Sequence, residues 1–105
     1  MGVVVIACYR PKPGKDAELE ALTREHVPIL REQGLVTQRT PVIMRSGDGT
    51  LVEVFEWESQ AAIDSAHENT EVSKLWQRYA EVCDYVKLID VNESAHPWAM
   101  FAPLN

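Results

Sequence analysis

The sequence predicts an α+β fold in which four antiparallel strands form one sheet with helices on one face. Two observations lead to this prediction. Short segments rich in β-branched residues alternate with two segments of helical period, and Pro, Gly and Ser residues separate them. Their order is strand, helix, strand, strand, helix, strand, which is the ferredoxin-like pattern. The 105 residues correspond to a single domain, with residues 93–105 as a C-terminal tail.

The first half of the chain contains two expected strands and one long helix. Residues 3–10 are apolar and β-branched and end at a proline, which is typical of a strand. Residues 15–33 carry apolar side chains on one stripe, so we expect a helix that ends before a glycine. Residues 35–46 are expected to form the second strand, and Pro41 within it favours an edge position or a bulge.

The second half contains two further strands and a helix that is broken in two. An Asp-Gly pair is a strong hairpin signal, and it precedes a third strand at residues 51–58. Ser59 is expected to cap a short helix that ends at Glu68. Thr70 is expected to cap the next helix. Residues 85–91 are expected to form the fourth strand.

The strands are apolar on both faces. In an antiparallel sheet that helices cover on one side, the open face is normally polar. In the first strand, however, Val3 and Val5 alternate with Val4 and Ile6. We expect the face that the helices leave bare to be covered by the same face of a second copy, related by two-fold symmetry, which gives a homodimer through the sheet faces. A monomer whose tail folds across the sheet is the alternative.

Composition argues against several classes of partner and location. The chain has 10 basic and 16 acidic residues, a net charge of −6, and no Lys/Arg cluster, so nucleic acid is not an expected partner. Its apolar N-terminal run is too short for a signal peptide or a membrane span, so we expect a cytoplasmic protein without a membrane partner. Cys8 and Cys83 are then expected as reduced thiols, with a disulfide as the alternative.

Two histidines are candidates for proton transfer, because imidazole titrates close to neutral pH. His67 lies near the end of the first short helix, where it could act as a general base toward a phenolic substrate or could be a capping or hydrogen-bonded structural histidine. His26 lies on the apolar stripe of the long helix, where it must bond a nearby carbonyl or line a pocket. The spacing of the histidines and cysteines matches no metal-binding motif, so a metal site is not expected.

Large aromatic side chains could form the wall of a binding site. Trp57, Trp76 and Tyr79 are expected between the sheet and the helices, where they either fill the core or shape a flat pocket for a small aromatic molecule. Glu53 shares a strand face with Trp57. We expect it at the rim of a dimer interface, paired with a basic side chain, and the alternative is a pocket carboxylate that helps to bind the substrate.

Two segments of the chain resemble a known family. In VVVIACYRPKPGKDAELEALTREH a strand and a Pro-Gly pair precede an acidic helix. In LVEVFEWESQAAIDSAHENTEV a strand, Trp-x-Ser, a helix and a His precede the Thr that opens the next helix. Over about residues 3–92 the chain resembles the antibiotic-biosynthesis-monooxygenase-like group of the dimeric α/β-barrel superfamily. Members of that group include cofactor-free quinol or polyketide oxygenases, haem-degrading enzymes, signalling-related proteins and many proteins of unknown function.

The resemblance implies a dimeric α/β barrel and, for the oxygenases, chemistry without a cofactor. His67 matches the family's His near the end of the first short helix. The Trp and His of the haem-degrading members fall at Ala66 and Gln77, so no residue here matches the haem-binding role. We therefore expect a cofactor-independent monooxygenase for aromatic or quinol-like molecules, in which His67 or His26 takes a proton. The alternative is a non-catalytic domain for small-molecule binding or association.

Overall fold

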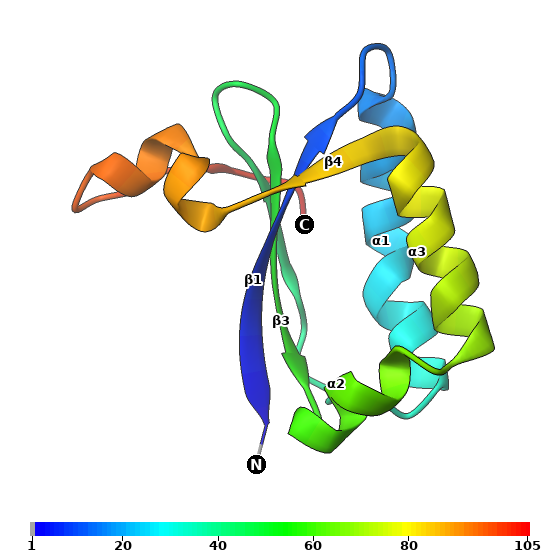
Figure 1. The fold of residues 1–105 in the computed structure, drawn as a ribbon. Helices are drawn as coiled ribbons and strands as arrows, with labels where there is room; N and C mark the ends of the chain where they lie inside the picture. The colour runs from blue at the N-terminus through cyan, green and yellow to red at the C-terminus, as the bar shows by residue number, and fades with distance from the viewer. Residues whose placement is uncertain (1) are drawn as a thin grey trace.

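A computed structural model describes residues 2–105, and it places one antiparallel sheet beneath a layer of helices (Figure 1). The elements in chain order are β1 (Val3–Pro11), α1 (Asp16–Glu32), β2 (Val42–Arg45), β3 (Leu51–Trp57), α2 (Gln60–Ala66), α3 (Thr70–Val82), β4 (Cys83–Val86), the 3-10 helices η1 (Leu88–Asp90) and η2 (Asn92–Ala95), and β5 (Ala102–Pro103). The strand order is β4-β1-β3-β2-β5. The predicted fold class is confirmed, although the sheet has five strands within the described residues instead of four.

The helices α1 and α3 pack on the same face of the sheet because each of them buries one apolar side. In α1 the buried positions recur every three or four residues and include Leu19, Leu22, His26 and Leu30. In α3 they are Val72, Leu75, Tyr79 and Val82. These side chains meet the helix-facing side of β1 and β3 and form the main core of the protein.

A side chain caps the start of both α2 and α3, and the sequence correctly predicted the first of these caps. The Ser59 Oγ accepts a hydrogen bond from the Ala62 N–H at 3.0 Å, so the predicted cap of α2 is confirmed. The predicted cap of α3 is wrong. Asn69 occupies that position and its Oδ1 accepts from the Val72 N–H at 3.1 Å, while Thr70 is the first helical residue. An Asn side chain satisfies the free N–H groups of a helix start as well as Thr does.

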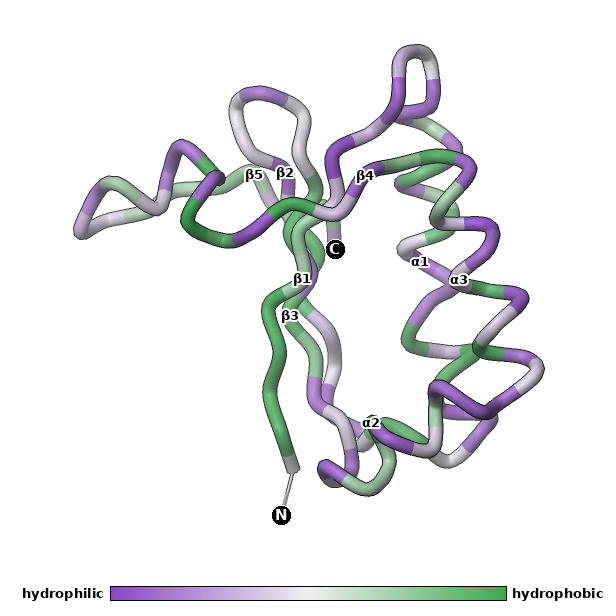
Figure 2. Tube along the Cα trace, in the orientation of Figure 1, coloured by the Kyte–Doolittle hydropathy of each residue, from purple (hydrophilic) through white to green (hydrophobic). Residues whose placement is uncertain are grey.

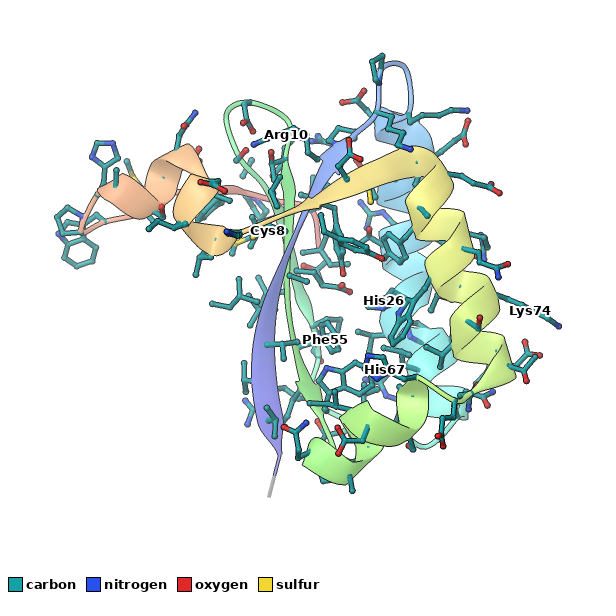
Figure 3. All side chains as sticks on the ribbon, in the orientation of Figure 1. Cys8, Arg10, His26, Phe55, His67 and Lys74 are labelled. Atoms are coloured by element: carbon teal, nitrogen blue, oxygen red, sulfur yellow. The ribbon has the colours of Figure 1, made fainter. Side chains whose placement is uncertain are left out.

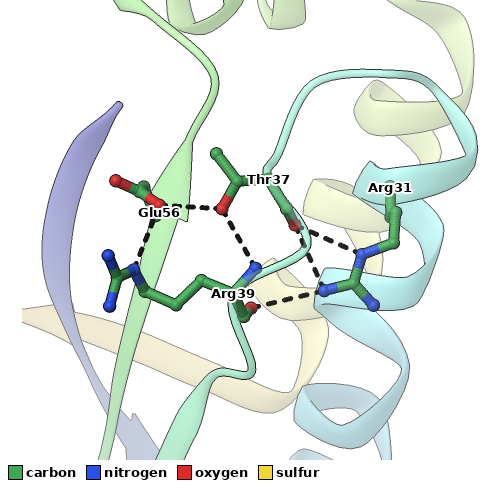
Figure 4. Close-up of polar contacts among 4 residues, drawn as sticks. All are labelled: Arg31, Thr37, Arg39 and Glu56. Carbon is green, nitrogen blue, oxygen red and sulfur yellow. Dashed lines mark hydrogen bonds and ion pairs between the residues drawn. The ribbon is translucent and has the colours of Figure 1, made fainter. Parts of the chain in front are cut away.

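The second strand is shorter than predicted, because the segment before it is held as a loop. The Arg31 guanidinium donates to the Thr37 carbonyl oxygen at 3.2 and 3.3 Å and to the Arg39 carbonyl oxygen at 3.3 Å (Figure 4). These carbonyl groups therefore do not pair with a strand. Val36 keeps only an isolated bridge to Trp57, and regular pairing begins at residue 42, after Pro41.

The fourth strand is also shorter and begins earlier than predicted. It pairs with β1 only from Cys8↔Val86 to Pro11↔Cys83, and the chain then turns into η1 instead of continuing as a strand. The predicted strand of residues 85–91 is confirmed only at Tyr85 and Val86, and it is wrong beyond them because residues 88–90 form the 3-10 helix η1, in which Leu88 and Ile89 are exposed. Residues 3–7 of β1 consequently pair with β3 alone.

The tail covers one end of the sheet face that is turned away from the helices. Phe101 packs against a small cluster of Cys8, Val52 and Val91, and β5 pairs with β2. The other end stays open: Val4 is 54% exposed and Ile6 is 49% exposed. Figure 2 shows the first half of β1 as a continuous hydrophobic segment. The tail thus shields this face only in part.

Two further findings concern the thiols and the helices. Cys8 and Cys83 are free and buried, as expected. Within residues 2–105, no helix has the length and apolar character that crossing a membrane requires.

Candidate functional site

A cavity of about 430 Å³ lies between the sheet and the helices. Its walls come from β1, α1, β3, α3 and β4, and six of the residues are aromatic side chains other than histidine. The lining residues are Val5, Ala7, Tyr9, His26, Phe55, Trp57, Trp76, Tyr79 and Tyr85. A concave, mainly apolar space with a small number of polar groups, here including the imidazole of His26, is the usual form of a small-molecule site.

The floor of the cavity is formed by the strand side chains that point toward the helices. Every second side chain of a strand points to the same face, so Val5, Ala7 and Tyr9 of β1 all point toward the helices. Phe55 of β3 stands opposite Val5 in the antiparallel register and points the same way. The short β4 adds Tyr85 opposite Tyr9. The floor is therefore a set of small aliphatic and large aromatic side chains.

His26 is held by a buried carboxylate. Its Nδ1 lies 2.8 Å from Oε1 of Glu53, and the Tyr9 hydroxyl donates to the same oxygen at 2.7 Å. His26 is 3% exposed and Glu53 is fully buried. An ionised carboxylate oxygen can only accept, so beside it a neutral imidazole would carry its proton on Nδ1 and its lone pair on Nε2. Figure 3 shows His26 and Phe55 in the space between the helices and the sheet.

Glu53 lies beneath the helices, so the expected position at the rim of a dimer interface is wrong. The basic residue Arg39 pairs instead with Glu56, on the opposite face of β3, at 3.0 Å. Ala7 stands opposite Glu53 in the register of β1 and β3, and its small side chain leaves room for a carboxylate at this depth. The second oxygen of Glu53, Oε2, has no hydrogen-bond partner among the described residues.

The buried tyrosines around His26 are held in their neutral form. Burial first, and then the Glu53 carboxylate, raises the pKa of Tyr9 well above its ordinary value. The same two causes raise the pKa of Tyr79. Tyr79 donates to the Thr23 hydroxyl at 3.2 Å, and its ring stacks on that of Tyr9 with 4.8 Å between centroids. Both hydroxyls are therefore hydrogen-bond donors at neutral pH.

His67, the other candidate base, lies apart from this arrangement. It is the exposed C-cap residue of α2, and its Nδ1 lies 3.0 Å from the Ile63 carbonyl oxygen. Its ring contacts the edge of Trp76 at 5.2 Å between centroids, but it is not one of the residues that line the cavity. The structure thus brings His26 together with Trp57, Trp76 and Tyr79, places Glu53 behind His26, and leaves His67 outside.

Three aromatic wall residues were not among the sequence candidates: Tyr9, Phe55 and Tyr85. The period of two along β1 and β3 was a usable signal for Tyr9 and Phe55, since it places them on the face of Val5 and Trp57. Tyr85 lies within the predicted strand of residues 85–91, but no local signal shows that it stands opposite Tyr9, because that pairing is set by tertiary packing. Among residues 2–105, no group of three His, Cys, Asp or Glu side chains is arranged to hold a metal ion.

Comparisons with known proteins identify the family and the fold. A family model described as "Antibiotic biosynthesis monooxygenase" matches residues 2–79. The solved structure titled "Structure of Rv0793 from Mycobacterium tuberculosis" is similar, with a TM-score of 0.65 and 22% sequence identity over 82% of this chain and 89% of that chain. At this identity the likeness shows a common fold. No curated protein matches the chain.

Proposed function

Because the chain belongs to the antibiotic biosynthesis monooxygenase family, we propose that it binds a flat hydroxylated aromatic molecule in the cavity and removes a proton from it. The observation that carries this proposal is the state of His26. Its Nδ1 is occupied by Glu53, whereas its Nε2 makes no hydrogen bond within the described part of the chain. A general base needs such a free lone pair next to the space that the substrate occupies.

The walls of the cavity support an aromatic and uncharged ligand. Trp57, Trp76, Phe55 and the tyrosines offer flat apolar surfaces, on which a ring can stack. None of the lining residues is Lys, Arg, Asp or Glu, so a carboxylate or phosphate group would enter without a counter-charge. The site therefore favours a neutral phenol, quinol or anthrone over an anionic metabolite.

The proposed reaction begins with transfer of one proton from the substrate to Nε2 of His26. The electron-rich anion that results can pass electrons to molecular oxygen without a cofactor. For an anthrone the balance is simple: the ring CH₂ group loses two hydrogen atoms, one oxygen atom becomes the new carbonyl, and the other leaves as water. The substrate is oxidised and the oxygen molecule is reduced, so no further reductant is required.

Oxygen uptake with a panel of hydroquinones and anthrones tests this function. We expect His26→Ala to lower the turnover number by about 100-fold or more, which is the usual contribution of a general base. His67→Ala serves as the matched control, because His67 lies outside the cavity, and its turnover should stay within about twofold. Equal turnover in wild type and His26→Ala would reject His26 as the base, and loss of turnover only in His67→Ala would assign that role to His67.

A non-catalytic binding protein is the second candidate. The observation that favours it is the wall of the cavity, in which His26 is the single residue equipped for proton transfer at neutral pH. A binding protein needs only the aromatic surfaces. Ligand-induced thermal stabilisation without oxygen uptake across the panel would favour this reading.

We also propose that the protein is a homodimer through the open face of its sheet. Half-exposed Val4, Ile6 and Val42 support a partner surface there, since water is an unfavourable cover for such side chains. A second copy presents the same apolar residues and meets them by two-fold symmetry. Light scattering at low micromolar concentration tests the assembly, and a mass of 11.9 kDa, that of one chain, would contradict it.

A further inference from the structure

Glu53 occupies an unusual place for a carboxylate. On the same face of β3 its neighbours Leu51, Phe55 and Trp57 are all apolar and buried. A carboxylate in such surroundings loses its hydration, and an apolar side chain of similar size would pack there at lower cost. Packing therefore does not explain why a carboxylate occupies this position, and the explanation must lie in the chemistry of the carboxylate.

The two carboxylate oxygens of Glu53 also differ in their hydrogen bonds. Nδ1 of His26 lies 2.8 Å from Oε1, and the hydroxyl of Tyr9 donates to the same oxygen at 2.7 Å. Oε2 has no partner within residues 2–105. A network that served stability alone would satisfy both oxygens, because an unpaired buried acceptor is destabilising. The arrangement instead directs one oxygen at His26.

We propose that Glu53 is a positioning residue that acts on the substrate only through His26, and that Tyr9 holds Glu53 in place for this task. The inference rests on the proposed function of the cavity and deepens it. Glu53 does not line the cavity. The positioning role therefore takes the place of the direct substrate contact that the sequence analysis had suggested for Glu53.

Glu53 performs two separate tasks in this scheme. By accepting from Nδ1 it selects one of the two neutral tautomers of His26 and so keeps the lone pair on Nε2. When a substrate O–H or C–H bond breaks and the N–H bond forms at Nε2, the imidazole becomes positively charged. The Glu53 charge then stabilises the imidazolium, while Glu53 stays ionised and Tyr9 keeps its proton.

Tyr9 fixes the direction of the carboxylate. Its hydroxyl reaches Oε1, and its ring packs against those of Tyr79 and Tyr85, with centroid separations of 4.8 and 5.8 Å. The neighbouring Tyr79 is anchored in turn by its bond to Thr23. A ring held in this way leaves the carboxylate little freedom to rotate away from His26.

Two substitutions at Glu53 separate the two tasks. Glu53→Gln keeps an oxygen that can accept both hydrogen bonds but removes the charge, so we expect an unchanged His26 tautomer and a turnover number about tenfold lower. Glu53→Leu removes the acceptor as well, so we expect a mixture of His26 tautomers and a turnover number about 100-fold lower. In both variants KM should stay within about twofold, because Glu53 does not touch the substrate. Glu58→Gln, at an exposed carboxylate that directly follows β3, is the control.

The tautomer is measured by ¹⁵N NMR of the imidazole ring in the protein without substrate. This readout does not depend on turnover, so it can fail or succeed independently of the proposed oxygenase function. Wild-type protein with the proton on Nε2, an unaltered tautomer in Glu53→Leu, or a loss that appears in KM and not in turnover would each overturn the proposal. If Glu53→Leu does not fold, the wild-type tautomer and the Glu53→Gln kinetics still decide the question, and Tyr9→Phe should weaken the tautomer preference.

Discussion

Nδ1 of His26 lies 2.8 Å from Oε1 of Glu53, although the two residues are 27 positions apart in the sequence. This contact joins α1 to β3 beside the cavity and gives the buried Glu53 carboxylate a partner, without which its burial would be costly. The predictions below follow from this relationship and from the elements around it.

Ligand binding should depend on Trp76 and be independent of Trp98. Trp76 lines the cavity, whereas Trp98 lies in the tail and is 84% exposed. Removing a stacking surface for an aromatic ligand typically costs about 1 kcal/mol, so we expect Trp76→Ala to raise Kd by roughly fivefold. Isothermal titration with a phenol found by thermal-shift screening measures this change. Equal affinities of Trp76→Ala and the Trp98→Ala control would place the ligand elsewhere.

Alkaline pH should destabilise the protein through its buried tyrosines. Burial, followed by the nearby Glu53 charge, raises the pKa of Tyr79 in the folded state above its ordinary value. In the unfolded chain Tyr79 loses its proton near pH 10, so from there upward the unfolded state binds fewer protons and the free energy of unfolding falls. Burial also raises the pKa of Cys83 to about 11, which adds to this loss.

Urea unfolding between pH 8 and pH 11 checks the alkaline prediction. We expect the unfolding midpoint to begin to fall near about pH 8.5, where the Cys83 thiol of the unfolded chain ionises, and to fall more steeply above about pH 10. Tyr79→Phe should show a shallower fall, because one of the titrating groups is gone. A midpoint that rises through this range would contradict the sign of the effect.

The corrected helix cap leads to a stability prediction. Asn69 accepts the Val72 N–H at the start of α3, so Asn69→Ala should lower the free energy of unfolding by about 1 kcal/mol. Thr70→Ala is the matched control, since Thr70 is exposed and does not cap the helix, and its effect should be about half as large or less. Chemical denaturation measures both. A larger loss in Thr70→Ala would restore the original assignment of the cap.

A charge on the open sheet face should prevent the proposed dimer. Ile6 is 49% exposed on this face, so Ile6→Lys would place two unpaired charges in the contact between copies. We expect a shift from twice the chain mass to the mass of one chain in analytical ultracentrifugation. Gln77→Lys, on the exposed side of α3, adds the same charge and should leave the assembly unchanged. An Ile6→Lys variant that sediments like the wild type would argue against a contact through this face.

The order of strands and helices could be predicted because each element carries its own local signal. The period of two in β1, the helical stripe in α1 and the Ser59 cap all act over a few residues. The ends of β4 could not be predicted in this way. Val86, Leu88 and Ile89 look like strand residues, but the chain turns at η1 and exposes the last two.

The candidate site shows the same division between local and long-range information. The alternation of β3 correctly grouped Glu53 with Phe55 and Trp57, and the stripe of α1 correctly marked His26 as a polar residue on an apolar side. Which face of the sheet the helices cover, and which residue of β3 stands beneath His26, are fixed only by tertiary packing. For that reason the pairing of His26 with Glu53 could not be read from the sequence.

The most direct test of the central claim is the protonation state of a phenol bound in the cavity. The dye 2-hydroxyanthraquinone has a flat ring system, and its absorption moves to longer wavelength when the hydroxyl group loses its proton. At a pH where the free dye is neutral, we expect the wild-type protein and His67→Ala to bind it as the phenolate and His26→Ala to bind it as the neutral phenol. A neutral spectrum on the wild-type protein, or a phenolate spectrum on His26→Ala, would contradict the assignment of His26 as the base.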